Sequence, residues 1–141
     1  MQPMTPDETR VFLLAGTRTA AVATVRADGR PHVAPVWFLL DGADIVFTTW
    51  RDTVKAANIR HDGRVSLLVD DETPPFAFVQ IDGIATLSDD LAAVRRWAEA
   101  IGGRYMGADR AAAYGARNGV PGELLVRVRP TRVIAQAGIA E

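Results

Sequence analysis

Residues 19–50, TAAVATVRADGRPHVAPVWFLLDGADIVFTTW, contain three segments rich in β-branched, aromatic and other apolar residues. Such residues favour strands, and the Asp-Gly pairs at 28–29 and 41–42 that separate the segments favour tight turns. The run therefore predicts three antiparallel strands with short connections, at residues 19–26, 32–40 and 44–50.

The flanking sequence surrounds this meander with more strands and with helices. Thr5, Pro6 and Glu8 predict a capped helix that ends at Gly16. Further helices are expected at residues 53–60, at 88–101 with Ser88 as the cap, and as Ala-rich material of undefined shape within 102–122. Further strands are expected at residues 64–70, at 76–87 with a bend at Gly83, and at 123–135 with a bulge or an edge at Pro130. Together these elements predict one mainly β domain over residues 1–141, a six-stranded antiparallel sheet with peripheral helices, most simply a small barrel.

The composition excludes several classes of function. The chain has 141 residues and no cysteine, which rules out disulfides, zinc fingers, iron–sulfur clusters and thiol nucleophiles. Sixteen basic and seventeen acidic residues leave a formal charge of −1, which argues against general nucleic-acid binding. Because no apolar run approaches the roughly 20 residues of a membrane span and the first residues do not resemble a signal peptide, we expect a cytoplasmic protein. His32 and His61 lack helical spacing and a third ligand, so we expect no metal site.

The segment around the only lysine of the chain contains the residues best suited to bind a ligand. Fifteen of the basic residues are Arg, and Lys55 is the only Lys. It lies in residues 48–60, TTWRDTVKAANIR, where a strand that ends in hydroxyls leads through a loop into a helix. Free helix amides, a Thr hydroxyl and an ammonium together favour a phosphate. A polar connection on the surface would have the same composition, so both interpretations stay open at this point.

The order of these motifs resembles a known family. Asp28-Gly29-Arg30-Pro31-His32, then Thr48-Thr49, then Lys-x-x-Asn from Lys55, then Arg64-Val65 are similar to the split β-barrel flavin-binding superfamily typified by pyridoxamine 5′-phosphate oxidase. The resemblance runs from about residue 5 to 135 and implies a split barrel of the FMN-binding type. The short chain and the ending LLVRVRPTRV (residues 124–133) resemble the actinobacterial branch, which uses the deazaflavin coenzyme F420.

The resemblance implies a set of cofactor contacts. The strand from His32 would lie along the ring system, the hydroxyls that follow would meet the ribityl chain or phosphate, and Lys55 would hold the phosphate. A later strand would approach the ring from the other subunit of a homodimer. The residues concerned are His32, Val33, Ala34, Pro35, Val36, Trp37, Thr48, Thr49, Thr53, Lys55, Asn58, Arg60, Phe78 and Gln80.

Two differences from the oxidase pattern argue against the activity of the oxidases themselves. Val54 stands where the oxidases have an Arg before the phosphate Lys, and the ending IAQAGIAE (residues 134–141) lacks their Arg and His contacts to pyridoxal phosphate. Vitamin B6 oxidation is therefore not expected. FMN remains the alternative cofactor, because Lys55 and the helix end could suffice for it. A non-catalytic flavin, deazaflavin or haem-binding protein is a further alternative, with His32 or His61 as the only available axial histidines.

The activity implied is hydride transfer from reduced coenzyme F420 to an electron-poor conjugated small molecule of the enone, quinone, lactone or tetrapyrrole class. The sequence shows no obligatory acid, so the proton would come from solvent or from His32, Tyr105 or Tyr114. Trp37 and Trp50 are compatible either with a packed core or with the walls of a pocket for a flat molecule.

Overall fold

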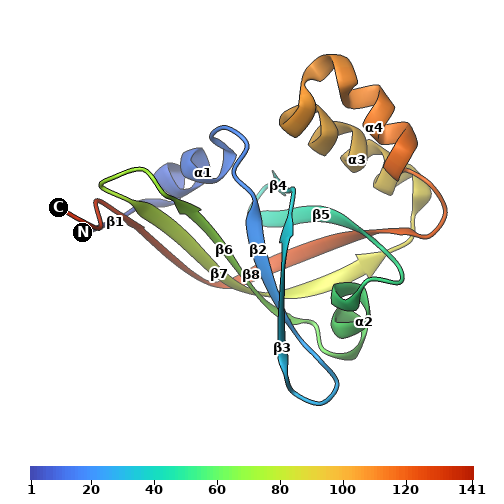
Figure 1. The fold of residues 1–141 in the computed structure, drawn as a ribbon, viewed down its shortest axis with the longest axis horizontal. Coiled ribbons are helices and arrows are strands. Elements are labelled where there is room, and N and C mark those ends of the chain that lie inside the picture. The colour runs from blue at the N-terminus through green and yellow to red at the C-terminus, as the bar shows by residue number, and fades with distance from the viewer.

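Eight strands and four α-helices make up the fold in a computed structural model, which describes residues 1–141 (Figure 1). The strands are β1 (Gln2–Pro3), β2 (Ala20–Val25), β3 (Pro31–Val36), β4 (Leu39–Asp41), β5 (Asp44–Trp50), β6 (Arg64–Asp71), β7 (Ala77–Ser88) and β8 (Glu123–Ala137). The helices are α1 (Pro6–Leu14), α2 (Val54–His61), α3 (Leu91–Met106) and α4 (Ala111–Asn118), with a short 3₁₀ turn, η1 (Ala108–Arg110), before α4.

All neighbouring strands are antiparallel, and their order is β3-β2-β6-β7-β8-β5-β4, with β1 added on β8. The sheet is not closed, since β3 and β4 form its two edges. The expectation of a mainly β, antiparallel split barrel with peripheral helices is therefore confirmed, although the structure has eight strands rather than six. The pairing of β1 with β8 brings the two chain ends together at one end of the molecule (Figure 1).

The predicted strand at residues 32–40 is wrong as a single element. It is divided at Trp37 and Phe38, so that β3 pairs with β2 and β4 pairs with β5. Side chains from α3 replace the strand partners at the break: the Phe38 N–H donates to the Tyr105 hydroxyl at 3.2 Å, and the Phe38 carbonyl accepts from Arg104 at 2.7 Å. Pro31 and Pro35 cannot donate to a ladder, which fits β3 to the edge of the sheet.

The helix after β7 begins later and runs further than expected. Its cap is Asp90 rather than Ser88, because the Asp90 carboxylate accepts from the N–H groups of Ala92 and Ala93. It continues through Gly102 to Met106. A Cβ at Gly102 would overlap the Tyr114 side chain, so the glycine allows α4 to pack directly against α3.

The other elements follow the sequence closely. Thr5 and Glu8 form the expected capping box, and Thr53 caps α2. The bend in β7 is a register shift between Asp82 and Gly83, opposite Pro130 on β8. The main core is one cluster of 17 buried residues that includes Phe38, Phe47 and Leu13 of α1.

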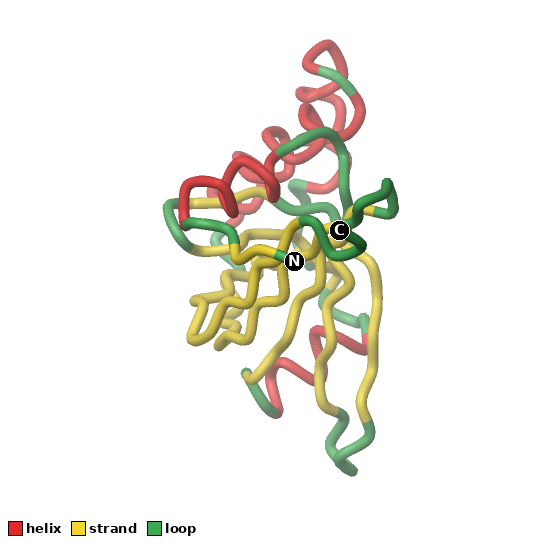
Figure 2. Tube along the Cα trace, turned by 90° about the vertical axis from the view of Figure 1, so that its left-hand side faces the viewer, coloured by secondary structure: helices red, strands yellow, loops and turns green.

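The helices lie on different sides of the sheet. In Figure 1, α3 and α4 form a pair above the right-hand end, and α2 lies below that same end. Figure 2 looks from the end with both termini and shows most helices above the strands, with α2 alone below. No helix combines the length and the apolar character needed to cross a bilayer.

Candidate functional site

A cleft of about 330 Å³ opens where the end of β5 meets the start of α2 and the inner side of α3. Its walls come from four parts of the chain that are distant in sequence. Its lining residues are Pro35, Val36, Trp37, Thr48, Thr49, Trp50, Thr53, Lys55, Ala98, Ile101, Gly102, Asn118 and Glu123. Seven of these are residues that the family resemblance implied, and the fold brings them to one place: Pro35, Val36, Trp37, Thr48, Thr49, Thr53 and Lys55.

Hydroxyl groups and free amides form one end of the cleft. The Thr53 hydroxyl donates to the Trp50 carbonyl at 2.9 Å and accepts from the Ala56 N–H at 3.3 Å, which fixes the start of α2. The hydroxyls of Thr49 and Thr53 lie 2.8 Å apart. The N–H groups of Val54 and Lys55, in the first turn of the helix, have no acceptor within the protein. Since the Thr53 hydroxyl proton is given to Trp50 and that of Thr49 to Thr53, the free donors at this end of the cleft are the two N–H groups and the Lys55 ammonium.

Lys55 is half-buried and forms none of the ion pairs of the chain. Burial lowers the pKa of its ammonium group, and the negative charge of Glu123 partly offsets that effect. Burial in turn raises the pKa of Glu123, and Lys55 partly offsets it. The charges of the two side chains thus interact electrostatically, although the side chains form no ion pair.

Trp37 forms the aromatic wall of the cleft, at the break between β3 and β4. Its ring stacks on Tyr105 with centroids 5.0 Å apart and an interplanar angle of 4°, and Tyr114 lies 5.8 Å away at 56°. The Tyr105 hydroxyl donates to the Arg18 carbonyl at 2.7 Å, and burial raises its pKa. The two tyrosines support the tryptophan from behind and do not line the cleft.

His32, Val33 and Ala34 lie further along β3 and do not line the cleft. His32 pairs with Thr24 of β2, and its Nδ1 atom is buried without a hydrogen-bond partner. Only the end of the predicted ring-binding strand, from Pro35 onward, reaches the cleft in a single chain.

Asn58 and Arg60 also point away from the cleft. The Asn58 side chain is buried and its amide donates to the Thr24 hydroxyl at 2.9 Å, which fastens α2 to β2. The Arg60 guanidinium donates to the Arg51 carbonyl at 3.1 Å on the surface. Of the polar residues on α2, Lys55 alone lines the cleft.

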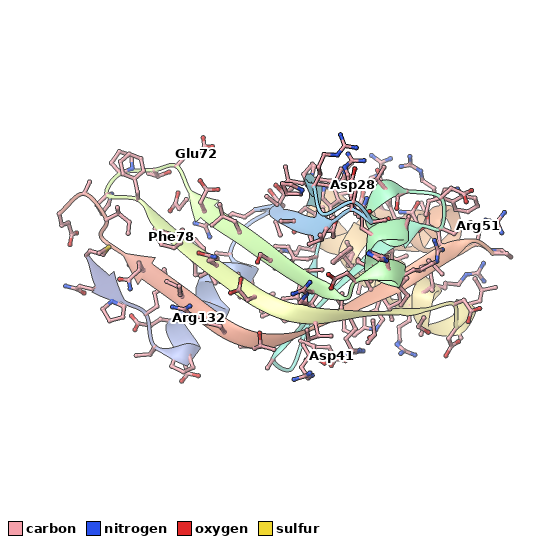
Figure 3. All side chains as sticks on the ribbon, turned by 90° about the horizontal axis from the view of Figure 1, so that it is seen from below. Asp28, Asp41, Arg51, Glu72, Phe78 and Arg132 are labelled. Carbon is pink, nitrogen blue, oxygen red and sulfur yellow. The ribbon has the colours of Figure 1, made fainter.

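Phe78 and Gln80 lie on the first half of β7, far from this site. Figure 3 shows Phe78 and Arg51, the residue after the end of β5, toward opposite ends of the molecule. Within one chain these two residues cannot contact a molecule in the cleft, so the expected contact requires a second subunit.

The sequence pattern did not identify the lining residues from α3, α4 and the start of β8. Ala98, Ile101 and Gly102 have ordinary helical composition, and their place depends on how α3 crosses the sheet. Glu123 is brought to the cleft by the register of β8, where it pairs with Trp50. The glycine before it has φ +99° and lies against the Trp50 ring, a close approach that a Cβ would prevent.

A larger cavity, of about 480 Å³, lies between α1, the β4–β5 turn and the bulge of β8. It is mostly apolar, and one of its two charged side chains, Arg10, donates to the Gly42 carbonyl at 2.9 Å. It holds none of the residues implied by the family resemblance. The smaller cleft has the donors and the aromatic wall, and is therefore the candidate site.

The sequence profile of the family described as pyridoxamine 5′-phosphate oxidase matches residues 5–137. No curated protein is similar to the chain in sequence.

Solved structures share the fold along nearly the whole chain. A conserved hypothetical protein from Mycobacterium tuberculosis is 26% identical, with a TM-score of 0.84 over 96% of this chain and 86% of that chain. A protein named F420 reductase is 27% identical, with a TM-score of 0.69 over 87% of this chain and 94% of that chain. An FAD-binding protein from Mesorhizobium loti is 18% identical, with a TM-score of 0.70 over 95% and 93% of the two chains, and shares the fold.

Proposed function

Since the chain belongs to the pyridoxamine 5′-phosphate oxidase family, we propose that it is an oxidoreductase of the deazaflavin branch, a reductase that binds reduced coenzyme F420 in the cleft beside Lys55 and Trp37. When bound, the coenzyme supplies a hydride to an electron-poor conjugated small molecule of the enone, quinone, lactone or tetrapyrrole class. The likeness to a protein named F420 reductase supports this branch.

The observation that carries the proposal is the anion-binding end of the cleft. A half-buried ammonium without an ion pair, two Thr hydroxyls and two free helix amides converge there. Desolvating a lysine costs free energy unless an anion compensates, so this end fits the phosphate of a coenzyme. Lys55, Thr53 and Thr49 would hold the phosphate.

The other end of the cleft fits a flat ring system. Trp37 presents a ring held by Tyr105 and Tyr114, and Pro35 on the edge strand leaves no N–H to satisfy there. These residues orient the ring and exclude water from one of its faces. None of the proton-donor candidates His32, Tyr105 and Tyr114 lines the cleft, so we assign the proton to water.

FMN is the second candidate, because its phosphate oxygens could accept hydrogen bonds from the same donors. Val54 in place of an Arg leaves a single cation in the cleft, which favours FMN less than a site with two cations would. A protein that binds a flavin, deazaflavin or haem without turnover is the remaining alternative.

Calorimetric titrations with coenzyme F420 and with FMN separate these candidates. We expect tight binding of F420, weaker binding of FMN, and turnover of the reduced coenzyme with at least one member of an enone and quinone panel. Preference for FMN would move the chain to the flavin branch. Tight binding without turnover would indicate a carrier, and absence of binding would overturn the cleft assignment.

Replacing Lys55 tests the phosphate contact directly. A charge-assisted hydrogen bond contributes about 1.5–3 kcal/mol, so Lys55→Ala should weaken F420 binding roughly ten- to a hundredfold. Arg96→Ala removes an exposed cation of α3 that forms no ion pair and is the matched control, with affinity expected to be unchanged. Equal affinities for wild type and Lys55→Ala would contradict the assignment.

A further inference from the structure

The charges inside the cleft cancel. Lys55 and Glu123 are its only ionisable lining residues, and the other lining residues are apolar, hydroxyl-bearing or amide-bearing. The cleft therefore has one positive and one negative charge, in a part of the protein where both groups are half-buried and solvent screening is reduced.

Glu123 is held in this position by the backbone. The residue pairs with Trp50 at the start of β8, and its own N–H donates to the Val120 carbonyl at 3.1 Å. Its carboxylate has no hydrogen-bond donor and no ion pair in the protein. Lys55 is the one cation that lines the same cleft, so an anion that binds Lys55 also meets the field of Glu123.

We infer that Glu123 makes this cleft selective for a phosphodiester over a phosphomonoester. This inference rests on the proposed function, in which Lys55 holds the phosphate of a ring-bearing coenzyme. A phosphomonoester carries nearly two negative charges at neutral pH, since its second pKa is about 6. A phosphodiester carries one. With a diester bound, the cleft carries one net negative charge, whereas a monoester leaves about two. The second charge of the monoester is repelled by Glu123, and the cleft has no further cation to offset that repulsion.

The two coenzymes considered above differ in this property. The phosphate of FMN is a terminal monoester, and the phosphate of coenzyme F420 is a diester that links the ribityl chain to the lactyl group and its glutamate tail. Glu123 would therefore act as a specificity-determining residue that discriminates against FMN. Val54, which precedes Lys55 and does not line the cleft, supplies no second cation for a monoester.

A pair of ligands that differ only in the phosphate tests this selectivity. FMN and its phosphate monomethyl ester share the ring and the ribityl chain, and the ester has one negative charge instead of about two at pH 7.5. Riboflavin, which has no phosphate, reports ring binding and the integrity of the fold in every variant. Dissociation constants are measured for the wild type, for Glu123→Gln, and for Glu99→Gln, which makes the same change at an exposed position of α3 outside the cleft.

The wild type should bind the methyl ester more tightly than FMN by about three- to tenfold, the size of one partly screened charge interaction. Glu123→Gln should reduce that ratio to near one by strengthening FMN binding, with riboflavin affinity unchanged. Glu99→Gln should keep the wild-type ratio. Tighter binding of FMN than of its ester by the wild type, or an unchanged ratio in Glu123→Gln, would overturn the inference.

Coenzyme F420 is titrated alongside to separate this inference from the proposed function. Binding of F420 without an ester preference leaves the coenzyme assignment standing and rejects the role of Glu123. An ester preference that Glu123→Gln abolishes, without F420 binding, rejects the coenzyme assignment and retains the charge selectivity. If neither F420 nor any of the flavins binds, both are rejected.

Discussion

The two ends of α2 carry charged side chains in opposite surroundings. Lys55 at the start is half-buried and unpaired, which lowers its pKa and prepares it for an anion. Asp62 at the end accepts hydrogen bonds from the Arg64 guanidinium at 2.7–3.2 Å and from the Arg64 N–H at 3.1 Å. The first is the side chain that we propose binds the phosphate, and the second fixes the turn into β6.

The Asp62 contacts predict its titration. They hold the pKa of this carboxyl at about 2, below the ordinary value of 3.8. A carboxyl whose folded pKa is depressed stabilises the fold above the unfolded value, and this contribution is lost as the pH falls from 3.8 toward 2. A carbon-detected NMR titration should find the low pKa, and Arg64→Ala should return it toward 3.8. An Asp62 pKa near 4 in the unmodified protein would refute the contact.

Of the two residues named by the Lys-x-x-Asn motif on α2, only Lys55 lines the cleft. The family resemblance implied that Lys55 holds the phosphate and included Asn58 as a weaker candidate, whereas in the structure the Asn58 amide donates to Thr24. Its partner is 34 positions away, on a strand whose place beside α2 is set by tertiary packing. Spacing along one helix identifies residues that share a face, and it does not reveal what that face meets.

The last turn of α3 helps to shape the site, although the sequence did not predict that this helix extends so far. The Gly102-Gly103 pair is typical of a helix end, so Arg104 and Tyr105 were not expected on this helix. Close packing against α4 makes the glycines acceptable in the helix interior. Directly after these glycines, the Arg104 guanidinium donates to the carbonyls of Leu13, Gly16 and Phe38 at 2.7–3.1 Å. The helix thereby fixes the strand break that presents Trp37.

Arg104→Ala should therefore destabilise the protein. Three carbonyls lose their donor, and with partial access to water we expect a cost of about 2–4 kcal/mol in the free energy of unfolding. Arg104→Lys should recover only part of this, because an ammonium cannot reproduce the planar donor fork. Urea unfolding measures both variants against Arg96→Ala, for which less than about 0.5 kcal/mol is expected. A loss as small as that of the control would show that Arg104 does not tie these segments together.

For the whole molecule, hydrophobic alternation and Asp-Gly turns were enough to predict a mainly β fold and the positions of most strands along the chain, but not the order of the strands in the sheet. They could not predict that the sheet stays open, because the apolar run at residues 32–40 has the same pattern whether the strand continues or divides at Trp37 and Phe38. They also missed β1, two residues whose only strand signal is pairing with the far end of the chain. The cleft is lined by residues from β3, β5, α2, α3, α4 and the start of β8. Because these segments are distant in sequence, the complete lining could be found only from the structure.

We propose a homodimer in which Phe78 and Gln80 of one subunit complete the cleft of the other. A mixture of Lys55→Ala with the double variant Phe78→Ala and Gln80→Ala tests it. Random assembly of equal amounts gives about half mixed dimers, each with one intact site, so about a quarter of all sites should bind F420. Each variant alone should bind weakly. A mixture that binds no better than its parts, after subunit exchange, would place each site within one chain.

The aromatic wall has a practical consequence for spectroscopy. Two of the three tryptophans of the chain, Trp37 and Trp50, line the cleft, and Trp97 packs against the small cluster around Val94. Ultraviolet emission from the native protein therefore comes mainly from the walls of its own site. A flavin-like chromophore bound in the cleft will quench that emission, including the emission of Trp97, which precedes the lining residue Ala98 on α3. Intrinsic tryptophan fluorescence should therefore report ligand binding in the cleft without an added label.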